Sequence, residues 1–315
     1  MINKRMQEIY DDCFDRFNKT KDYDDRACLE DIIEWFQKYV GPAHPYLYTI
    51  LYLDSKYEEF VTLGAFKISE DYKKWAINNK DFLTGIFSNF ANLELKDKVD
   101  NNTLVPNTDE IVGEFFKTMD MDLYNLFINS KNNIFRVYDH SGGKALYDPV
   151  KDQVYVLFGK EHNFRNMVTL VHEMGHCFKD HLIKKVYSTN SVEEHLKSEL
   201  YSEIIEHIFA IYLVNNDIYA IDAYDHLNNT RNEIIEVSRK LSDAIIVNDD
   251  SSTLHEIKYL LGRILAYYYI ESGMSLKEIF MDIHNHTTLE ILSNPNIDYQ
   301  EISNKLNKNY CLKKQ

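Results

Sequence analysis

Glycine and proline are scarce in this chain, whose 315 residues include only ten glycines and five prolines. Average usage predicts roughly twice as many glycines in a chain of this length. Because these two residues mark most turns, their scarcity favours long helices with few breaks. Hydrophobic residues make up 44% of the chain, enough for the core of one large domain or two small ones. We therefore expect a mainly α fold.

Long apolar runs are also absent. The first residues, MINKRMQEIYDDCFDRF, become charged at once and lack the apolar stretch of a secretion signal. No segment reaches the roughly 18 apolar residues of a membrane-spanning helix, and YLLGRILAYYYI is both short and interrupted by Arg263. We expect a cytoplasmic protein with no membrane partner.

Two further absences disfavour other kinds of binding site. The four cysteines, Cys13, Cys28, Cys177 and Cys311, show no CxxC spacing, which argues against a disulfide framework and against a cysteine zinc site. Basic residues are outnumbered, because 35 Lys and Arg face 50 Asp and Glu, giving a net charge of -15. Nucleic acid is not an expected partner, since its binding requires a basic patch.

The segment KDKVDNNTLVPNTDE (96–110) is the most linker-like part of the chain. It divides an N-terminal helical region, residues 1–105, from a region of residues 106–315, although the two can also form one continuous domain. Apolar residues spaced three and four apart predict several helices before this segment. A capped helix is expected to begin near Thr108.

The sequence pattern changes between residues 134 and 158. IFRVYD, SGGKALYDPVKDQ and VYVLF are short runs that contain β-branched or apolar residues and are separated by Gly, Asp and Pro, which predicts a small sheet or hairpin. Helical periodicity then returns, and the predicted helices cover residues 163–182, 191–215, 217–246, 253–271 and 275–285. The expected fold is mainly α with a small sheet or hairpin next to one helix.

The stretch TLVHEMGHCF (169–178) contains an HExxH sequence. Residues four apart lie on one face of a helix, so His172 and His176 can direct both imidazoles at one metal ion. Glu173 would then lie beside that ion, close to a water molecule. A catalytic zinc site needs three protein ligands and an open fourth position. The alternative is that HExxH arises by chance in a chain with twelve histidines.

A third ligand must come from elsewhere in the chain. The extended pattern HExxHxxGxxH is excluded, because Lys179 stands at its glycine and Leu182 at its last histidine. His181 is one position away from that last histidine and would point elsewhere.

A carboxylate on the following helix is the other source of a third ligand. In SELYSEIIEHIF (198–209), Glu199, Glu203 and Glu206 share one helical face, opposite an apolar face. Three acids on one face can also be merely solvated. Helical spacing alone does not separate the three glutamates.

Both segments resemble a known family, the oligopeptidases related to thimet oligopeptidase and oligoendopeptidase F. TLVHEMGHCF resembles the HExGH helix of that family, and ELYSEIIE resembles its downstream ExxSxxxE segment. The run LYDPVKDQVYVLFGKEHNFRNMVTLVHE is similar to the strand, turn and helix that lead into the motif. Family members are much longer, and Lys179 replaces a histidine that usually follows the zinc pair.

The resemblance implies a zincin-like metallopeptidase with one Zn²⁺ per chain. His172, His176 and Glu199 would be the zinc ligands, and Glu173 would be the general base that acts on water.

The late segment HEIKYLLG (255–262) resembles the family's Tyr-x-x-Gly segment, whose tyrosines and histidine contact the substrate carbonyl. By that resemblance Tyr259 and His255 are further catalytic residues. The alternative for Tyr259 is an ordinary place in the core, since the chain contains 23 tyrosines.

We expect a zinc metallopeptidase that hydrolyses peptides or unfolded polypeptides. An extended substrate would add as a strand to an exposed sheet edge, for which VYVLF (154–158) is the candidate, and SGG (141–143) would let a backbone approach closely. VYVLF can instead be an internal strand. Two other classes stay open: a zinc-binding regulatory or binding protein without turnover, and a structural helical protein without metal.

Overall fold

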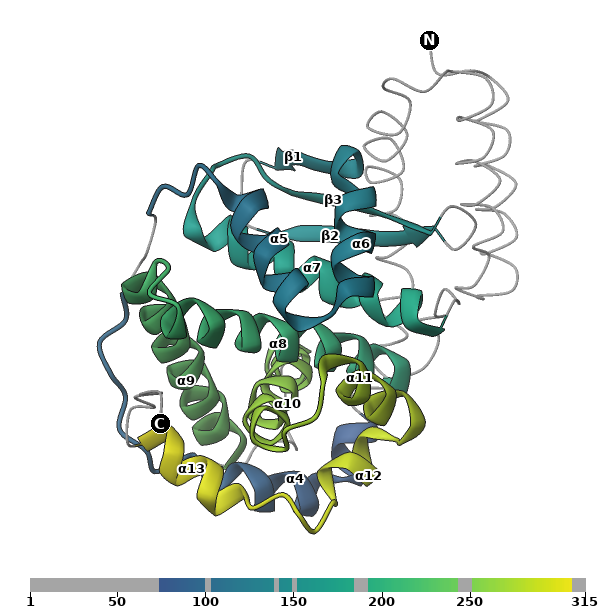
Figure 1. Ribbon diagram of the computed structural model, residues 1–315. Coiled ribbons are helices and arrows are strands. Elements are labelled where there is room, and N and C mark those ends of the chain that lie inside the picture. The colour runs from purple at the N-terminus through teal and green to yellow at the C-terminus, as the bar shows by residue number, and fades with distance from the viewer. Residues whose placement is uncertain are drawn as a thin grey trace. The chain divides into compact units, whose positions relative to one another are not determined.

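The computed structural model describes residues 74–99, 103–138, 142–148, 152–183, 192–242 and 251–307 (Figure 1). The chain forms two compact units, one of Met1–Lys74 with Tyr187–His195 and one of Trp75–Val186 with Leu196–Gln315. The helices predicted before residue 74 lie outside the described residues. The predicted division near residue 105 stays a prediction.

Helices dominate the second unit, so the prediction of a mainly α fold is confirmed. They are α4 (Lys80–Phe87), α5 (Thr108–Met119), α6 (Met121–Asn129), α7 (Phe164–Ile183), α8 (Val192–Asn215), α9 (Ala220–Ser242), α10 (Ser251–Glu271), α11 (Leu276–Asn285), α12 (Thr288–Leu292) and α13 (Tyr299–Asn307). The five predicted helices after residue 162 correspond to α7 through α11. Among the described helices, none has both the length and the apolar character that crossing a membrane requires.

A small sheet precedes α7, as predicted. Its strands β1 (Ile134–Tyr138), β2 (Gly143–Asp148) and β3 (Gln153–Gly159) lie in the order β1-β3-β2. β3 pairs with β1 in parallel and with β2 in antiparallel orientation.

The prediction that VYVLF forms the exposed sheet edge is wrong. These residues make up most of β3, which is the central strand and is paired along both edges. All five of their side chains are buried, so both faces of the strand are covered. A continuous apolar run is typical of a strand that is buried on both faces, whereas a half-exposed strand alternates apolar and polar residues.

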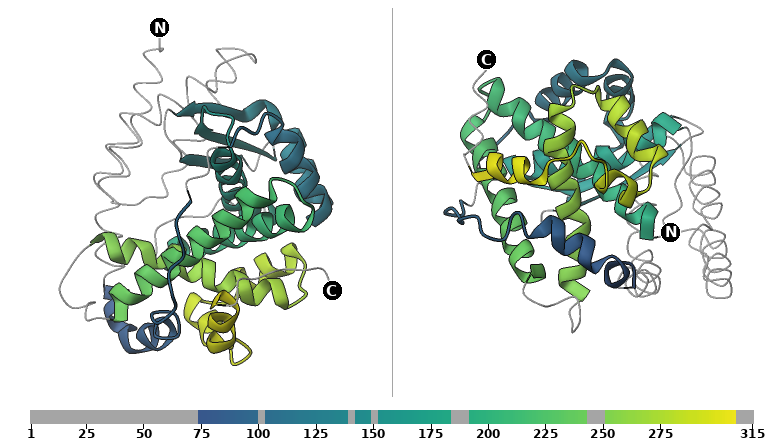
Figure 2. Two further views of the ribbon diagram at one scale, coloured as in Figure 1. Left: turned by 90° about the vertical axis from the view of Figure 1, so that its left-hand side faces the viewer. Right: turned by 90° about the horizontal axis from the view of Figure 1, so that it is seen from below.

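Helix α8 crosses the middle of the second unit (Figure 1 and Figure 2). The sheet with α5, α6 and α7 lies on one side of it, and α9 to α13 with α4 lie on the other. Aromatic contacts join the layers: the rings of Phe116 and Phe178 are 4.7 Å apart, and those of Phe115 and Phe209 are 4.9 Å apart. These contacts fix α5 against both α7 and α8.

Two glycines allow α7 and α10 to approach α8 closely. A Cβ atom added at Gly175 of α7 would lie 2.8 Å from Cα of Ser202, and one added at Gly262 of α10 would lie 2.7 Å from Cβ of Glu203. Both distances are shorter than carbon atoms tolerate, so larger residues would push the helices apart. The glycine of HExGH and the glycine of YLLG therefore bring side chains from three helices together.

The segment before α5 differs from its prediction. α5 begins at Thr108 as expected, but the N-cap residue Asn107 makes no side-chain capping bond. Upstream, Asn232 of α9 accepts a bond from the backbone N of Lys96 at 3.0 Å and donates one to its carbonyl at 2.8 Å. Part of the linker-like sequence is thus fixed against α9.

Candidate metal centre

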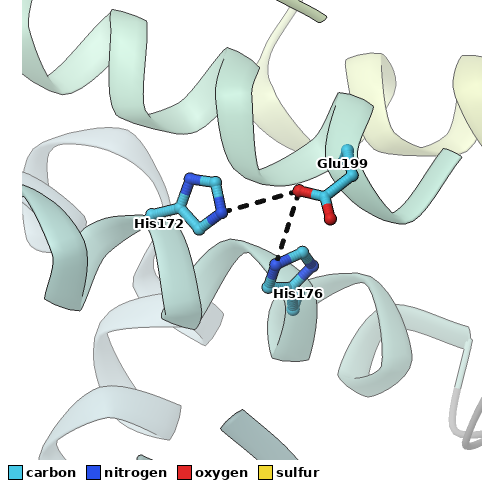
Figure 3. A group of neighbouring side chains, drawn as sticks. All are labelled: His172, His176 and Glu199. Carbon is cyan, nitrogen blue, oxygen red and sulfur yellow. Dashed lines mark ion pairs between the residues drawn. The ribbon is translucent and has the colours of Figure 1, made fainter. Parts of the chain in front are cut away.

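Three side chains from α7 and α8 converge on one point (Figure 3). His172 and His176 lie one turn apart on α7, and Glu199 faces them from α8. Its Oε2 atom is 3.7 Å from Nε2 of His172 and 4.0 Å from Nε2 of His176. The structure thus brings together the three residues that the sequence predicts as metal ligands, with one candidate ligand atom from each within 4.8 Å of the others.

The carboxylate of Glu199 has one engaged oxygen and one unpartnered oxygen. Oε1 accepts a hydrogen bond from Nζ of Lys258 at 2.8 Å, whereas Oε2 is buried and has no hydrogen-bond partner. A buried polar atom without a partner is costly. The distances to the two imidazoles are too long for hydrogen bonds but suit three ligand atoms around one ion, since bonds to zinc are about 2.0–2.2 Å long. The residues present therefore fit a metal ion.

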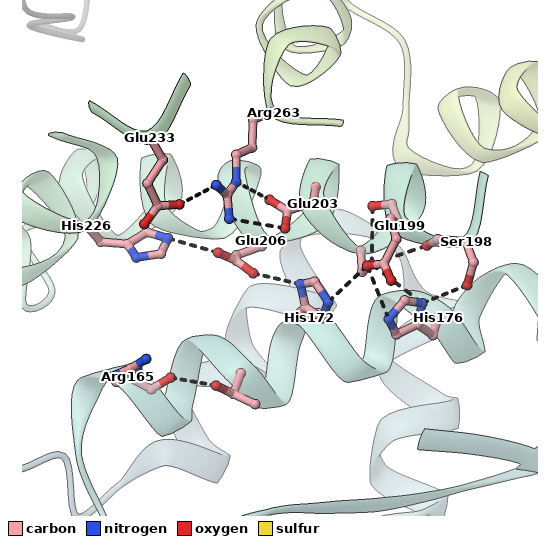
Figure 4. Close-up of polar contacts among 12 residues, drawn as sticks. Arg165, His172, His176, Ser198, Glu199, Glu203, Glu206, His226, Glu233 and Arg263 are labelled. Atoms are coloured by element: carbon pink, nitrogen blue, oxygen red, sulfur yellow. Dashed lines mark hydrogen bonds and ion pairs between the residues drawn. The ribbon is translucent and has the colours of Figure 1, made fainter. Parts of the chain in front are cut away.

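Each imidazole is held by a second contact at Nδ1 (Figure 4). Nδ1 of His172 lies 2.8 Å from Oε2 of Glu206, and Nδ1 of His176 lies 3.0 Å from Oγ of Ser198. The other oxygen of Glu206 lies 3.1 Å from Nε2 of His226. Partners of this kind orient the ring of a metal-ligating histidine, leaving both Nε2 atoms directed at Glu199.

A second group of possible ligands, His172, Glu203 and Glu206, lies beside the first. Its carboxylates already have partners, because Glu203 accepts a bond from Nε of Arg263 at 2.8 Å and Glu206 contacts both His172 and His226. Arg263 also contacts Glu233. Of the two groups, the one containing Glu199 is the better metal site, because Oε2 of Glu199 makes no hydrogen bond and lies near the Nε2 atoms of both histidines.

The pKa values of Glu199 and His176 give both side chains the protonation state of a metal ligand. Burial lowers the pKa of His176 to about 3, so that imidazole is neutral. Burial acts to raise the pKa of Glu199, but contacts with His172, Lys258 and His176 outweigh it and hold the pKa well below the usual value. Metal binding requires this combination of a neutral imidazole and an ionised carboxylate.

His172 behaves differently. Burial acts to lower its pKa, but contacts with Glu199 and Glu206 outweigh burial and raise the pKa well above the usual value. In the metal-free chain the imidazolium therefore lies between two carboxylates, and an ion that binds Nε2 must displace a proton.

Glu173 lies next to this group on α7, in the wall of a pocket of about 750 Å³. The pocket is also lined by His172, by Gly143 of β2 and by Tyr259 of α10. A Cβ atom added at Gly143 would lie 2.5 Å from Cγ of Glu173, so the glycine allows the β2 backbone to reach the glutamate. Glu173 is thus positioned between the candidate metal ligands and an extended strand.

The structure places Tyr259 in the pocket wall with Glu173 and His172. Burial raises the pKa of its phenol, which is therefore protonated and able to donate a hydrogen bond at neutral pH. His255 belongs to α10, but its side chain lies outside the described residues, so its catalytic role stays a prediction. His181 points elsewhere, as expected, and its Nδ1 lies 2.7 Å from Oδ1 of Asp152.

Sequence reasoning missed four residues that organise this site: Ser198, His226, Lys258 and Arg263. Arg263 carried the clearest signal, because a charged residue inside the apolar run YLLGRILAYYYI requires a buried partner. Lys258 lies just before that run, after the polar residues His255 and Glu256, and carried a weaker signal. Ser198 and His226 gave no such signal.

The contact between Glu206 and His172 leads to a prediction. Glu206→Gln should lower zinc affinity about 10- to 100-fold, the usual cost of losing a partner of a metal-bound histidine. Competition with a chromophoric chelator measures this change. Glu233→Gln is the matched control, because Glu233 contacts Arg263 and not a candidate ligand. Equal affinities in both variants would contradict the orienting role of Glu206.

Comparisons with known proteins give limited similarity. No family model and no curated protein sequence matches the chain. The chain is similar to the crystal structure of a protein from Bacillus anthracis str. Ames that is assigned as an oligoendopeptidase F, with 11% sequence identity and a TM-score of 0.39. The match covers 76% of this chain and 52% of that one, so the chain spans about half of that protein's length. At this level of similarity, the role of the site must follow from its own residues.

Proposed function

We propose that the chain is a zinc-dependent peptidase that hydrolyses peptide bonds in peptides or oligopeptides, as its resemblance to the oligopeptidases implies. The observation that carries this proposal is the unpartnered Oε2 atom of Glu199, directed at the Nε2 atoms of His172 and His176. Glu173 lies next to these residues in a pocket of about 750 Å³, within the size range of small-molecule sites.

His172, His176 and Glu199 would hold the zinc. Zinc at this position would lower the pKa of a water molecule and polarise the scissile carbonyl. Glu173 would accept the proton of that water and pass it to the nitrogen of the departing amine. Two features support this role: Glu173 adjoins a candidate ligand in the sequence, and its side chain lines the pocket.

Tyr259 would stabilise the negative charge that develops on the carbonyl oxygen. Burial keeps its phenol protonated, so the group can donate a hydrogen bond to that oxygen. Its place in the same pocket wall as Glu173 supports this role.

The edge of β2 is the better candidate for holding an extended peptide. Among the described residues β2 pairs only with β3, so its other edge has no strand partner. Gly143 places that strand against Glu173. A peptide that added to β2 as a further strand would have its backbone hydrogen bonds met and would run past the catalytic glutamate.

Two measurements test this proposal. The purified chain should contain one zinc per molecule, or bind one when zinc is added, as measured by elemental analysis. Incubated with a diverse peptide mixture, the zinc-loaded chain should produce new termini detectable by mass spectrometry, and a chelated sample should produce none. A chain that binds zinc and cleaves nothing would support a zinc-binding protein without turnover. A chain that binds no zinc would exclude both functions.

A further inference from the structure

The three candidate ligands are held by groups of different charge. His172 is held by the carboxylate of Glu206 and His176 by the hydroxyl of Ser198, whereas Glu199 is held by the ammonium of Lys258. The Lys258 side chain is only 4% exposed, so water does not screen this ion pair effectively. A cation therefore contacts the one negatively charged ligand of the site.

Lys258 affects Glu199 in two ways. Its Nζ atom lies 2.8 Å from Oε1, so this oxygen is engaged while Oε2 faces the histidines. Its positive charge also repels a second cation that binds the same carboxylate, and this repulsion is strong at a buried position. The first effect fixes the carboxylate, and the second weakens its hold on a metal.

We propose that Lys258 is a positioning residue that keeps Oε1 of Glu199 away from the metal and makes the metal exchangeable. This inference rests on the proposed function, since it requires a metal between Glu199 and the two histidines. In the metal-free chain the same ion pair balances the buried carboxylate and keeps it in place. Lys258 thus stabilises the empty site and destabilises the occupied one.

Lys258→Met tests this inference, because methionine is similar in length and lacks the charge. The variant should bind zinc at least about tenfold more tightly than the wild type and release it correspondingly more slowly, because a buried repulsion is gone. Competition with a chelator measures the affinity, and transfer of zinc to excess chelator measures the release rate. Lys258→Arg keeps the charge and should behave like the wild type.

A second substitution controls for the loss of a buried lysine. Lys197 lies two residues before Glu199 on α8, is 9% exposed, and donates a hydrogen bond to the carbonyl of His284 at 3.2 Å. Lys197→Met should leave zinc affinity unchanged. Thermal unfolding adds a measurement that does not depend on activity: zinc should raise the melting temperature of Lys258→Met by more than it raises that of the wild type.

The outcomes separate this inference from the proposed function. A wild-type chain that binds no zinc contradicts the proposed function itself. A wild-type chain that binds zinc, with Lys258→Met binding equally or more weakly, overturns the inference alone. If the metal-free variant does not fold, it can be purified with zinc and its release rate measured, and a rate equal to or above that of the wild type gives the same negative answer.

Discussion

Glu173→Gln should slow peptide hydrolysis at least about 100-fold while leaving one zinc bound per chain. Glutamine keeps the size of the side chain but cannot accept the proton of the attacking water. Loss of a general base costs about 10²- to 10⁴-fold in rate. Glu173 is not among the three residues whose atoms converge on the metal position, so the zinc content should not change.

This substitution separates chemistry from metal binding and from folding. Glu173 is 6% exposed and packs against Gly143, and glutamine can occupy the same space. Cleavage of a peptide mixture measures the rate, and elemental analysis measures zinc in the same preparation. Glu114→Gln, an identical change at an exposed position of α5, should retain activity. If Glu173→Gln cleaved peptides at the wild-type rate, hydrolysis would have to occur at another site.

Local sequence predicted the helices better than it predicted the sheet. The bounds of α7 follow from apolar spacing within the helix, which the chain encodes locally. α8 also matches its predicted bounds, although its buried residues surround the helix and do not form one apolar stripe. The place of β3 at the centre of the sheet depends on its neighbours β1 and β2, and a strand's own residues do not say which edges are paired. The unbroken apolar run VYVLF did indicate an internal strand, because such runs are typical of strands that are buried on both faces.

In the candidate site, too, local sequence predicted some residues, whereas others depend on contacts with distant parts of the chain. The HExxH spacing on one helix was enough to predict His172, Glu173 and His176 as site residues. Helical spacing left Glu199, Glu203 and Glu206 equivalent, because all three lie on one face of α8.

Residues distant in the sequence distinguish the three glutamates. Lys258 donates a hydrogen bond to only one oxygen of Glu199. Glu203 is bound by Arg263. The two oxygens of Glu206 contact His172 and His226. Burial raises the pKa of Glu203 to about 7, whereas Glu199 stays ionised. Of the three carboxylates, Glu199 alone is both charged and left with an unpartnered oxygen.

This difference makes the sharpest prediction for the metal site: Glu199→Gln should lose zinc, whereas Glu203→Gln should keep it. The two variants carry the same change one helical turn apart. Glu199→Gln should weaken zinc binding by more than the roughly 100-fold that loss of an outer partner costs, because it removes a ligand. Equilibrium dialysis against buffered zinc measures both affinities.

The contact with Lys258 explains why glutamine at position 199 should fail as a ligand. Nζ of Lys258 is only a donor, so the amide oxygen of the glutamine will turn toward it, as Oε1 of Glu199 does now. The amide NH₂ group must then face the two histidines, and it has no lone pair to offer a metal. Combining Glu199→Gln with Lys258→Met frees the amide to rotate, so the double variant should recover part of the zinc affinity. Loss of zinc by Glu203→Gln with retention by Glu199→Gln would reassign the third ligand to Glu203.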